Sequence, residues 1–508
     1  MFRGYFFCIF TNFKSMRKYT KTICSAVAFA GVALMWALKY PFLLGFHEQN
    51  QLFLWTGDYL AGSLALPGGL ADWIAEFITQ FYALPWLGAL LLSGVLIALQ
   101  RLTWRCFETE CGAWYPLSFI PSALMLCLMG DHDAMLCLAV AIAGSLALCL
   151  RYKARPSAAL AMIGTLAGYW LLGPAIVIFP LYVLWRDRRL YSLVYLAALA
   201  AELALLRLTL LCQYPWRQLL LGLDYYRMPL HQPLLQVITT FSPIIAILAA
   251  DLLPQVRCKF AGPVLAAAVA GLCALGISQT YDKDRLEVLA LDQLVREEDW
   301  NSVIERVKEC PPKSELSCVC QNLALCMTGQ MKDMFDYVQC GPQGLIMPRV
   351  RDNISNAASC EVFWRLGFVN ESLRYAFDTQ ESIANFRKSG RWMSRMAECQ
   401  LVNGRYAVAS KYLDILKHSL FYRKWAISRE DLLWDEAAIE IDPIYGYLRS
   451  VRSQEDYLYY YPEMDKMLGN LYITNRNNMM AGWYYQAWKA MTRDEKVEDS
   501  SAGGAHGN

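Results

Sequence analysis

Residues 22–44 read TICSAVAFAGVALMWALKYPFLL and carry a single charged side chain, Lys39. About 20 apolar residues in a helix span the ~30 Å hydrocarbon core of a bilayer, so this stretch predicts a membrane-spanning helix. The sequence Ala28-Phe29-Ala30 resembles a signal-peptide cleavage site. However, the apolar run continues through Leu38 and follows a long basic segment, which favours an uncleaved anchor.

Apolar runs of this kind recur only in the first 280 of the 508 residues. We predict about nine spans, near 22–44, 84–104, 114–130, 134–150, 157–172, 174–185, 190–212, 234–253 and 260–278. The fifth and sixth are short and are separated by Gly173-Pro174, so they form either a tight hairpin or one broken helix. The predicted fold class is all-α: a polytopic transmembrane helical bundle over 1–280, followed by a helical-repeat domain.

The loop charges predict the orientation, because Lys and Arg are retained on the cytoplasmic side of a membrane. With the N-terminus in the cytoplasm, the inner segments hold fifteen basic residues and the outer loops hold three. Nine spans then place everything after residue 280 outside the cytoplasm. We therefore expect a bacterial inner (cytoplasmic) membrane protein whose C-terminal domain is periplasmic. The net charge of +2 does not indicate a nucleic-acid partner.

The second half is charged and shows a recurring helix-turn-helix pattern over 281–492. The aligned turn positions Trp300, Met331, Val369 and Tyr406 are 31, 38 and 37 residues apart. This spacing, and the segment 403–416 in particular, resembles the tetratricopeptide repeat of 34 residues. The resemblance implies an α-solenoid with a concave surface for a protein partner. The polar tail 493–508 is expected to be disordered.

The cysteines follow no metal-binding spacing. Seven of the 17 lie in the second half, at positions 310, 318, 320, 326, 340, 360 and 399. An odd number of irregularly spaced cysteines is unusual for a domain in an oxidising compartment, whereas free thiols are ordinary in the cytoplasm. The charge asymmetry of the loops still favours the outer location.

The first outer loop, 45–83, contains a predicted amphipathic helix. Apolar and aromatic residues from Leu70 to Tyr82 recur at a spacing of three to four, and Asp72, Glu76 and Gln80 fall on the other side. Such a helix lies in the membrane interface or packs against the bundle. Polar groups precede it, at His47, Glu48 and Asp58, just after the first span.

The second outer loop consists almost entirely of Asp131-His132-Asp133. Two carboxylates at a membrane surface must be solvated or paired, so one interpretation is a hydrated turn that ends two helices. The other is a divalent metal site, occupied by Mg²⁺ or Mn²⁺, because paired carboxylates hold a cation that bridges phosphate oxygens.

The third outer loop supplies Arg217, Arg227 and His231, and arginine is suited to binding phosphate. His47, His132 and His231 thus fall in three different outer loops. Inside the seventh span, Glu202 and Arg207 each cost about 2.5–3.5 kcal/mol at mid-bilayer. Because they are five residues apart, we expect each to need a partner on another helix or a polar cavity.

Two resemblances bear on function. With its Glu48–Leu54 and Pro67–Leu70 segments, the chain resembles an uncharacterised bacterial membrane family known only as a domain of unknown function. The layout of 1–230 is similar to the GT-C membrane glycosyltransferases. That similarity implies a catalytic base at Glu48 or Asp58, a metal at Asp131 and Asp133, and a lipid-linked phosphate bound by Arg217 or Arg227.

Two main functional hypotheses follow. The first is transfer of a sugar from a polyprenyl-phosphate donor to an acceptor on the outer side. The second is a non-enzymatic membrane scaffold whose repeat domain recruits an envelope protein. A transporter is a third, supported by Glu202 and Arg207 but not by any internal duplication of the spans.

Overall fold

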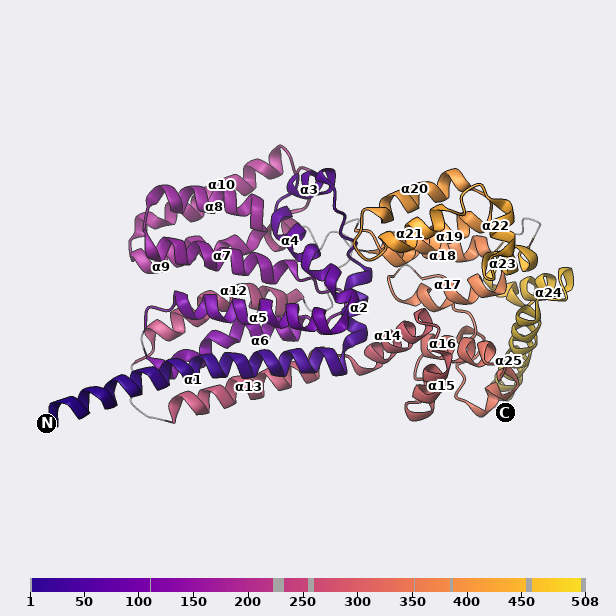
Figure 1. Ribbon diagram of the computed structural model, residues 1–508, viewed down its shortest axis with the longest axis horizontal. Helices are drawn as coiled ribbons and strands as arrows, with labels where there is room; N and C mark the ends of the chain where they lie inside the picture. The colour runs from indigo at the N-terminus through magenta and orange to yellow at the C-terminus, as the bar shows by residue number, and fades with distance from the viewer. Residues whose placement is uncertain are drawn as a thin grey trace. The chain divides into compact units, whose positions relative to one another are not determined.

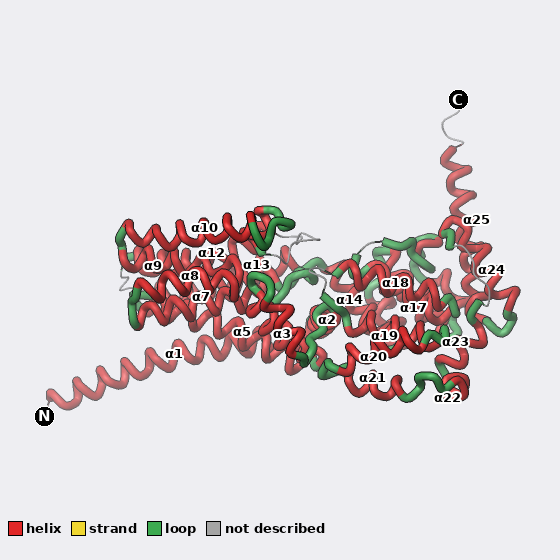
Figure 2. The backbone as a smooth tube through the Cα atoms, turned by 90° about the horizontal axis from the view of Figure 1, so that it is seen from above, coloured by secondary structure: helices red, strands yellow, loops and turns green. Residues whose placement is uncertain are grey.

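The computed structural model describes residues 2–109, 111–222, 233–254, 260–350, 352–383, 387–453 and 459–503. Within these ranges the regular structure is entirely helical, with no strand (Figures 1 and 2). The chain divides into two compact units, which we call unit 1 (Met1–Asp282) and unit 2 (Lys283–Asn508). The division lies close to the domain boundary that the sequence predicts at residue 280.

Unit 1 is a bundle of roughly parallel and antiparallel helices (Figure 1). Its helices are α1 (Phe2–Lys39), α2 (Pro41–Gln49), α3 (Gly57–Leu64), α4 (Gly69–Thr79), η1 (Gln80–Ala83), α5 (Pro85–Cys106), η2 (Gly112–Phe119), α6 (Ile120–Leu128), α7 (Cys137–Ala154), α8 (Ala158–Leu172), η3 (Gly173–Val177), α9 (Ile178–Asp187), η4 (Leu190–Ser192), α10 (Leu193–Leu208), α11 (Trp216–Leu221), α12 (Pro233–Leu252) and α13 (Ala261–Thr280). Seven helical segments are long and apolar enough to cross a membrane, and a shorter apolar one covers Gly112–Leu128. These features indicate a membrane protein.

The helices α1 and α5 pack together through a buried polar network. Ser25 donates to Gln100 Oε1 over 2.9 Å, and Gln100 Nε2 donates to Ser118 Oγ over 2.7 Å. Ser25 Oγ also lies 2.7 Å from the Tyr115 hydroxyl. Hydrogen bonds of this kind hold helices together where lipid removes the hydrophobic driving force between them.

The segment around Gly173 is a hairpin rather than one broken helix. Gly173 has a φ of +72°, which lets the chain reverse there. A Cβ added at Gly164 would lie 2.8 Å from the Phe179 ring, and one at Gly168 would lie 2.4 Å from the Ile176 side chain. The later glycine, Gly168, thus faces the earlier partner, Ile176, and the earlier glycine, Gly164, faces the later one, Phe179. The chain therefore reverses between them, and α8 and α9 are antiparallel neighbours.

Charged residues gather where α5, α7, α9 and α12 end. The Glu108 carboxylate accepts from Arg186 and lies 3.6 Å from Lys153 Nζ. Lys153 also donates to the Phe107 carbonyl over 2.6 Å, which ties the ends of α5 and α7. Asp251 on α12 accepts from the backbone N–H groups of Glu108 and Thr109, each over 3.0 Å. We call this end of unit 1 the basic end.

Unit 2 is a succession of helices joined by short turns. They are α14 (Lys283–Arg296), α15 (Trp300–Glu309), α16 (Glu315–Met327), η6 (Met331–Asp336), η7 (Pro342–Gly344), α17 (Ser355–Leu366), α18 (Val369–Ser382), α19 (Gly390–Val402), α20 (Tyr406–Lys417), α21 (Arg423–Glu430), α22 (Glu436–Ile441), α23 (Tyr445–Val451), η9 (Tyr461–Glu463), α24 (Met464–Thr474) and α25 (Met479–Gly503). Trp300, Val369 and Tyr406 each begin the second helix of a hairpin, whereas Met331 begins only a 3₁₀ turn. The predicted tail forms the end of α25 up to Gly503, and 504–508 lie outside the described residues.

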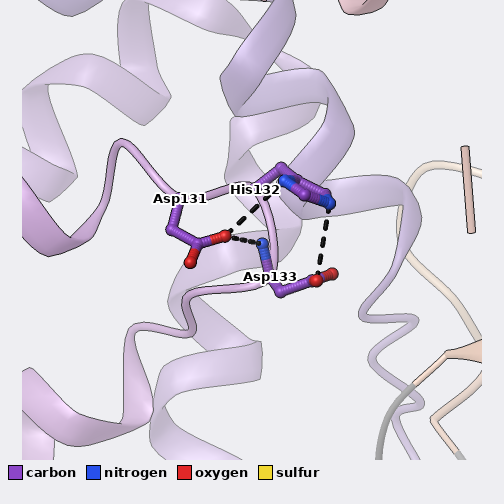
Figure 3. A group of neighbouring side chains, drawn as sticks. All are labelled: Asp131, His132 and Asp133. Carbon is purple, nitrogen blue, oxygen red and sulfur yellow. Dashed lines mark hydrogen bonds and ion pairs between the residues drawn. The ribbon is translucent and has the colours of Figure 1, made fainter. Parts of the chain in front are cut away.

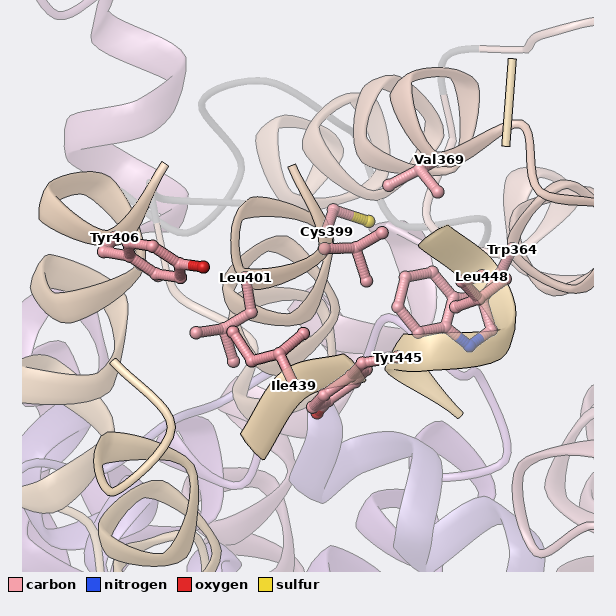
Figure 4. Close-up of a cluster of buried hydrophobic side chains, with 10 residues drawn as sticks. Trp364, Val369, Cys399, Leu401, Tyr406, Ile439, Tyr445 and Leu448 are labelled. Carbon is pink, nitrogen blue, oxygen red and sulfur yellow. The ribbon is translucent and has the colours of Figure 1, made fainter. Parts of the chain in front are cut away.

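The core of unit 2 lies between its hairpins (Figure 4). Trp364, Val369, Cys399 and Leu401 pack with Ile439, and each is almost fully buried. Charged residues are buried here too. Arg391 donates two hydrogen bonds to Asp292, of 2.6 and 3.0 Å, and Arg395 donates to Glu361 over 2.8 Å. These bonds join α14, α17 and α19, and they fix how the hairpins stack because each buried charge needs its partner.

Candidate functional site

The strongest candidate site is the turn that joins α6 to α7. The Asp131 N–H donates to the Leu128 carbonyl over 2.9 Å, and the Asp133 N–H donates to Asp131 Oδ1 over 3.2 Å. Gly130 precedes these residues, and a Cβ there would lie 2.2 Å from carbons of the Tyr281 ring. Glycine is therefore required for the turn to approach the end of α13 so closely.

The three side chains of this turn face one another (Figure 3). His132 Nδ1 lies 3.5 Å from Asp131 Oδ1, and His132 Nε2 lies 3.4 Å from Asp133 Oδ2. One ligand atom from each residue lies within 4.8 Å of the others. Asp131 and His132 are buried, with exposed fractions of 5% and 6%. Among the described residues, this is the only group of His, Cys, Asp or Glu with such metal-binding geometry.

Helix α2 brings His47 to this turn. Pro41 begins α2, where its fixed φ suits the first helical position. His47 Nε2 then lies 3.4 Å from the Met129 carbonyl oxygen, and the Phe46 ring packs against His132 with centroids 5.7 Å apart. Burial lowers the pKa of His47 to about 4, and the nearby His132 adds to this effect, although Met129 and Asp133 oppose it. His47 is therefore a neutral imidazole at pH 7, the form that can bind a cation.

The polar run after His47 is also buried. Glu48, Gln49, Asn50 and Gln51 each have exposed fractions of 5% or less. Several buried oxygens just after α2, on α4 and η1, and in the α6–α7 turn have no hydrogen-bond partner among the residues described: Asn50 Oδ1, Gln51 Oε1, Thr79 Oγ1, Tyr82 OH and Asp131 Oδ2. Leaving such an atom unsatisfied costs about 1–3 kcal/mol. Buried polar atoms of this kind are satisfied in folded proteins by ordered water or by a ligand.

The amphipathic helix α4 differs from its prediction in one respect. Glu76 and Gln80, expected on a polar face, are each only 5% exposed. The Tyr59 hydroxyl donates to Glu76, and Trp55 Nε1 donates to Gln80 Oε1 over 3.3 Å. The chain before and within α3 therefore covers these polar groups, an arrangement that the periodicity of α4 does not reveal.

The other predicted site residues lie elsewhere or outside the described ranges. Asp58 is exposed in the first turn of α3, and Arg217 is exposed on α11. Arg227 and His231 lie outside the described residues. The structure thus gathers His47, Asp131, His132 and Asp133, with Glu48 next to His47 on the same buried helix, and does not bring Asp58 or Arg217 into a described contact with them.

Glu202 and Arg207 form no ion pair with each other among the described side chains. Arg207 donates to the Cys212 carbonyl over 2.5 Å and so helps to end α10. Glu202 Oε2 is buried without a partner in the described part of the chain. The absence of the pair agrees with their five-residue separation on one helix.

Unit 1 also contains a small cavity of about 90 Å³ that the sequence did not predict. Leu138, Val177, Leu221 and Phe241 are among its apolar lining residues, and Tyr169 and Gln236 are among its polar ones. Gly68 and Gly173 also line the cavity. The backbones of these two glycines approach closely there, since a Cβ added at Gly68 would lie 3.6 Å from the Gly173 Cα. The Pro67-Gly68 and Gly173-Pro174 pairs were the only sequence signal for this close approach.

Unit 2 has a wider, mostly apolar groove with a volume of about 560 Å³. Met327, Ile444, Tyr447 and Met479 line it and are between 39% and 50% exposed. Arg365 is the only charged residue among the described residues of the lining. It already pairs with Glu298 over 2.8 Å.

Comparison with known proteins gives a family but no activity. No curated protein and no solved structure matches this chain. One family model, described as "Family of unknown function (DUF6057)", matches residues 17–496 and so covers both units. The chain therefore belongs to this family of unknown function, DUF6057.

Proposed function

We propose that this protein is a membrane-embedded glycosyltransferase that binds Mg²⁺ or Mn²⁺ at the Asp131–Asp133 turn and transfers a sugar from a polyprenyl-phosphate donor. One observation carries the proposal. The ligand atoms of Asp131, His132 and Asp133 lie within 4.8 Å of one another, and Asp131 Oδ2 is buried with no partner among the residues described. A buried carboxylate oxygen of this kind is stabilised by a cation or a hydrogen-bond donor.

The chemistry of the site suits a phosphate-bearing substrate. Carboxylate oxygens are the ligands that Mg²⁺ prefers, and Mg²⁺ keeps positions open for phosphate oxygens. A cation there would neutralise the charge that develops on a departing lipid phosphate. Glu48, buried beside His47, is the proposed base for the acceptor hydroxyl. Asp58 is the less suitable base, because it is exposed on α3 and has no described contact with the Asp131–Asp133 turn.

The proposal also needs the site to lie at the outer surface. Counting Gly112–Leu128 and both arms of the α8–α9 hairpin, we infer nine passes with the N-terminus in the cytoplasm. The basic end, with Lys153 and Arg186, is then cytoplasmic, as the retention of positive charge requires. The Asp131–Asp133 turn and unit 2 are then on the opposite side of the membrane.

Cation binding to the purified full-length protein tests the site. Titration with Mn²⁺, followed by electron paramagnetic resonance, should show binding that Asp131→Asn weakens by roughly tenfold or more, since the variant loses a charged ligand. Asp187→Asn is the matched control, because Asp187 accepts from Tyr152 over 2.8 Å at the basic end. Equal Mn²⁺ affinity in wild type and Asp131→Asn would reject the metal site.

Sugar transfer tests the activity itself. Membrane vesicles with the wild-type protein should transfer labelled sugar from a polyprenyl-phosphate donor to an endogenous acceptor. Asp131→Ala combined with Asp133→Ala should abolish transfer, while the amount of protein inserted in the membrane stays unchanged. Full transfer by the double variant would exclude this mechanism.

The apolar groove of unit 2 favours a second candidate, a scaffold that recruits an envelope protein. The described lining residues include no carboxylate, and Met479 is 50% exposed there, so an apolar side chain of a partner peptide would fit. Met479→Glu should then reduce cross-linking to that partner in intact membranes. Ile473→Glu is the control, since Ile473 is 63% exposed but does not line the groove. If the protein is a scaffold, the Asp131→Asn variant should still cross-link to the partner.

A further inference from the structure

The described part of the segment between α16 and α17 contains two short 3₁₀ turns and no α-helix. Side-chain amides hold it against α16. Gln321 Nε2 donates to the Val338 carbonyl over 2.9 Å. Asn322 and Gln339 exchange two amide hydrogen bonds, of 2.9 and 3.1 Å. The part of this segment around residue 339 is therefore fixed in register along one face of α16.

Two cysteines extend this row of contacts. Cys318 lies one helical turn before Asn322, on the same face of α16, and Cys340 follows Gln339. The two Sγ atoms are 2.8 Å apart, closer than a relaxed contact between non-bonded sulfur atoms. A Cβ added at Gly344 would lie 2.9 Å from the Cys318 Cβ and 3.5 Å from the Cys340 Cβ. Both cysteine Cβ atoms thus lie against the same glycine and therefore near each other, whereas in a disulfide they lie about 3.8 Å apart.

We infer that Cys318 and Cys340 are joined by a disulfide bond in the mature protein. The inference rests on the proposed outer location of unit 2, because disulfides persist in oxidising compartments. Each thiol gives up one proton and one electron as the S–S bond forms. The two electrons reduce the disulfide of an exchange partner, a thiol–disulfide oxidoreductase, to two thiols. Cys340 is half-buried and is the thiol that such a partner reaches first.

The other cysteines of unit 2 fit this assignment. Cys320, Cys326, Cys360 and Cys399 are buried, and Cys310 is exposed. Among the described cysteines of unit 2, Cys318 and Cys340 are the pair whose sulfur atoms contact each other. The seven cysteines therefore resolve into one bridge, four buried thiols and one surface thiol. The odd number no longer conflicts with an oxidising compartment.

Peptide mapping of the full-length protein tests the bridge. Cells are quenched in acid, free thiols are alkylated, and the protein is digested with trypsin without reduction. Lys332 lies between the two cysteines, so the bridge joins two separate peptides, 314–332 and 333–349. We expect this linked pair in the wild type. It should be absent from Cys318→Ala and Cys340→Ala but present in Cys320→Ala, which removes a buried thiol in the same peptide.

Two outcomes would overturn the inference in different ways. If both cysteines are alkylated in cells but link when the purified protein meets an oxidised dithiol, the geometry is right and the outer location of unit 2 is wrong. If they stay unlinked in both samples, the geometry is wrong. Mn²⁺ binding by unit 1, measured on the same Cys318→Ala protein, should be unchanged, so failure of the bridge is distinct from failure of the metal site.

Discussion

At the scale of single residues, the molecule keeps charged and polar groups buried in both of its units. In unit 1, His47 and Asp131 lie where the buried oxygens have unfilled hydrogen-bonding capacity. In unit 2, the buried charges of Glu361 and Arg395 satisfy each other. Buried oxygens with an open position also occur in unit 2, at Gln321 and Gln400 for example, so an open position alone does not indicate binding. We assign the site to unit 1 because, among the described residues, only Asp131, His132 and Asp133 bring three metal-ligand atoms within 4.8 Å of one another.

The free energy of unfolding of unit 2 should depend on pH through the ionisation of Glu361. Burial would raise the pKa of this carboxyl, but Arg395 and Arg391 outweigh that effect and lower it to about 2. Glu361 binds a proton more tightly in the unfolded chain than in the folded one, so its ionised carboxylate stabilises the folded state. This stabilisation is complete above about pH 4.5. It is lost as the pH falls towards 2, and amounts to roughly 3 kcal/mol.

Urea unfolding of the fragment 283–492, followed by circular dichroism, measures this effect. Glu361→Gln should lower the free energy of unfolding by about 3–5 kcal/mol at pH 7, since it leaves two buried guanidinium groups short of a partner. The difference from wild type should shrink as the pH falls from 5 to 2. Glu398→Gln is the control, because burial raises the pKa of Glu398 and the same loss on acidification is not expected. A difference that is constant with pH would contradict the assignment.

At the scale of elements, glycines in left-handed conformations end several helices. Gly367 follows α17 with a φ of +88°, and Gly404 follows α19 with a φ of +70°. The two differ in their surroundings. A Cβ at Gly404 would meet nothing within 4 Å, whereas one at Gly367 would lie 3.1 Å from the Val451 carbonyl oxygen. The helix hairpins of unit 2 therefore depend on these two positions to different degrees.

This difference predicts unequal costs for the same substitution. Gly404→Ala should lower the free energy of unfolding by about 1 kcal/mol, the usual cost of a left-handed alanine. Gly367→Ala should cost clearly more, because the backbone of the α23 C-terminus must also move. Both are measured by urea unfolding of the 283–492 fragment. Equal losses would show that the contact with Val451 is unimportant.

At the scale of the whole molecule, the orientation in the membrane connects the two proposals. Cys310 is exposed in unit 2, and Cys111 is half-buried near the basic end of unit 1. With nine passes, Cys310 faces the outside and Cys111 the cytoplasm. A membrane-impermeant maleimide added to intact spheroplasts should therefore label Cys310, and should label Cys111 only after permeabilisation.

Variants that keep either Cys310 or Cys111 as the single cysteine make the labelling of these two positions comparable. The labelling is measured by mass spectrometry of the full-length protein. The reverse pattern would place unit 2 in the cytoplasm. An enzyme reporter fused after Asn508 that is active only outside the cytoplasm gives an independent check.

Much of the architecture could be predicted because its signals are local. The run 22–44 is apolar over the length of a bilayer, so α1 needs no distant contact to be recognised. The Asp131-His132-Asp133 group was equally visible, since adjacent residues in a tight turn are necessarily close. Among the described residues, an all-helical fold is confirmed, with seven helices long and apolar enough to cross a membrane. The span count, the tetratricopeptide resemblance and the glycosyltransferase resemblance stay predictions.

Only the tertiary structure decided the contacts between segments that are far apart in the chain. His47 meets Met129 across 82 residues, Glu76 is covered by Tyr59, and Gly164 admits Phe179 so that α8 and α9 form a hairpin. Periodicity and composition report the length and the apolar face of a helix but not which side chain of another helix fills its surface. The sequence alone thus determined that the chain is helical, with apolar helices long enough to cross a membrane followed by a second helical unit. Packing decided which polar groups share a site and which cysteines meet.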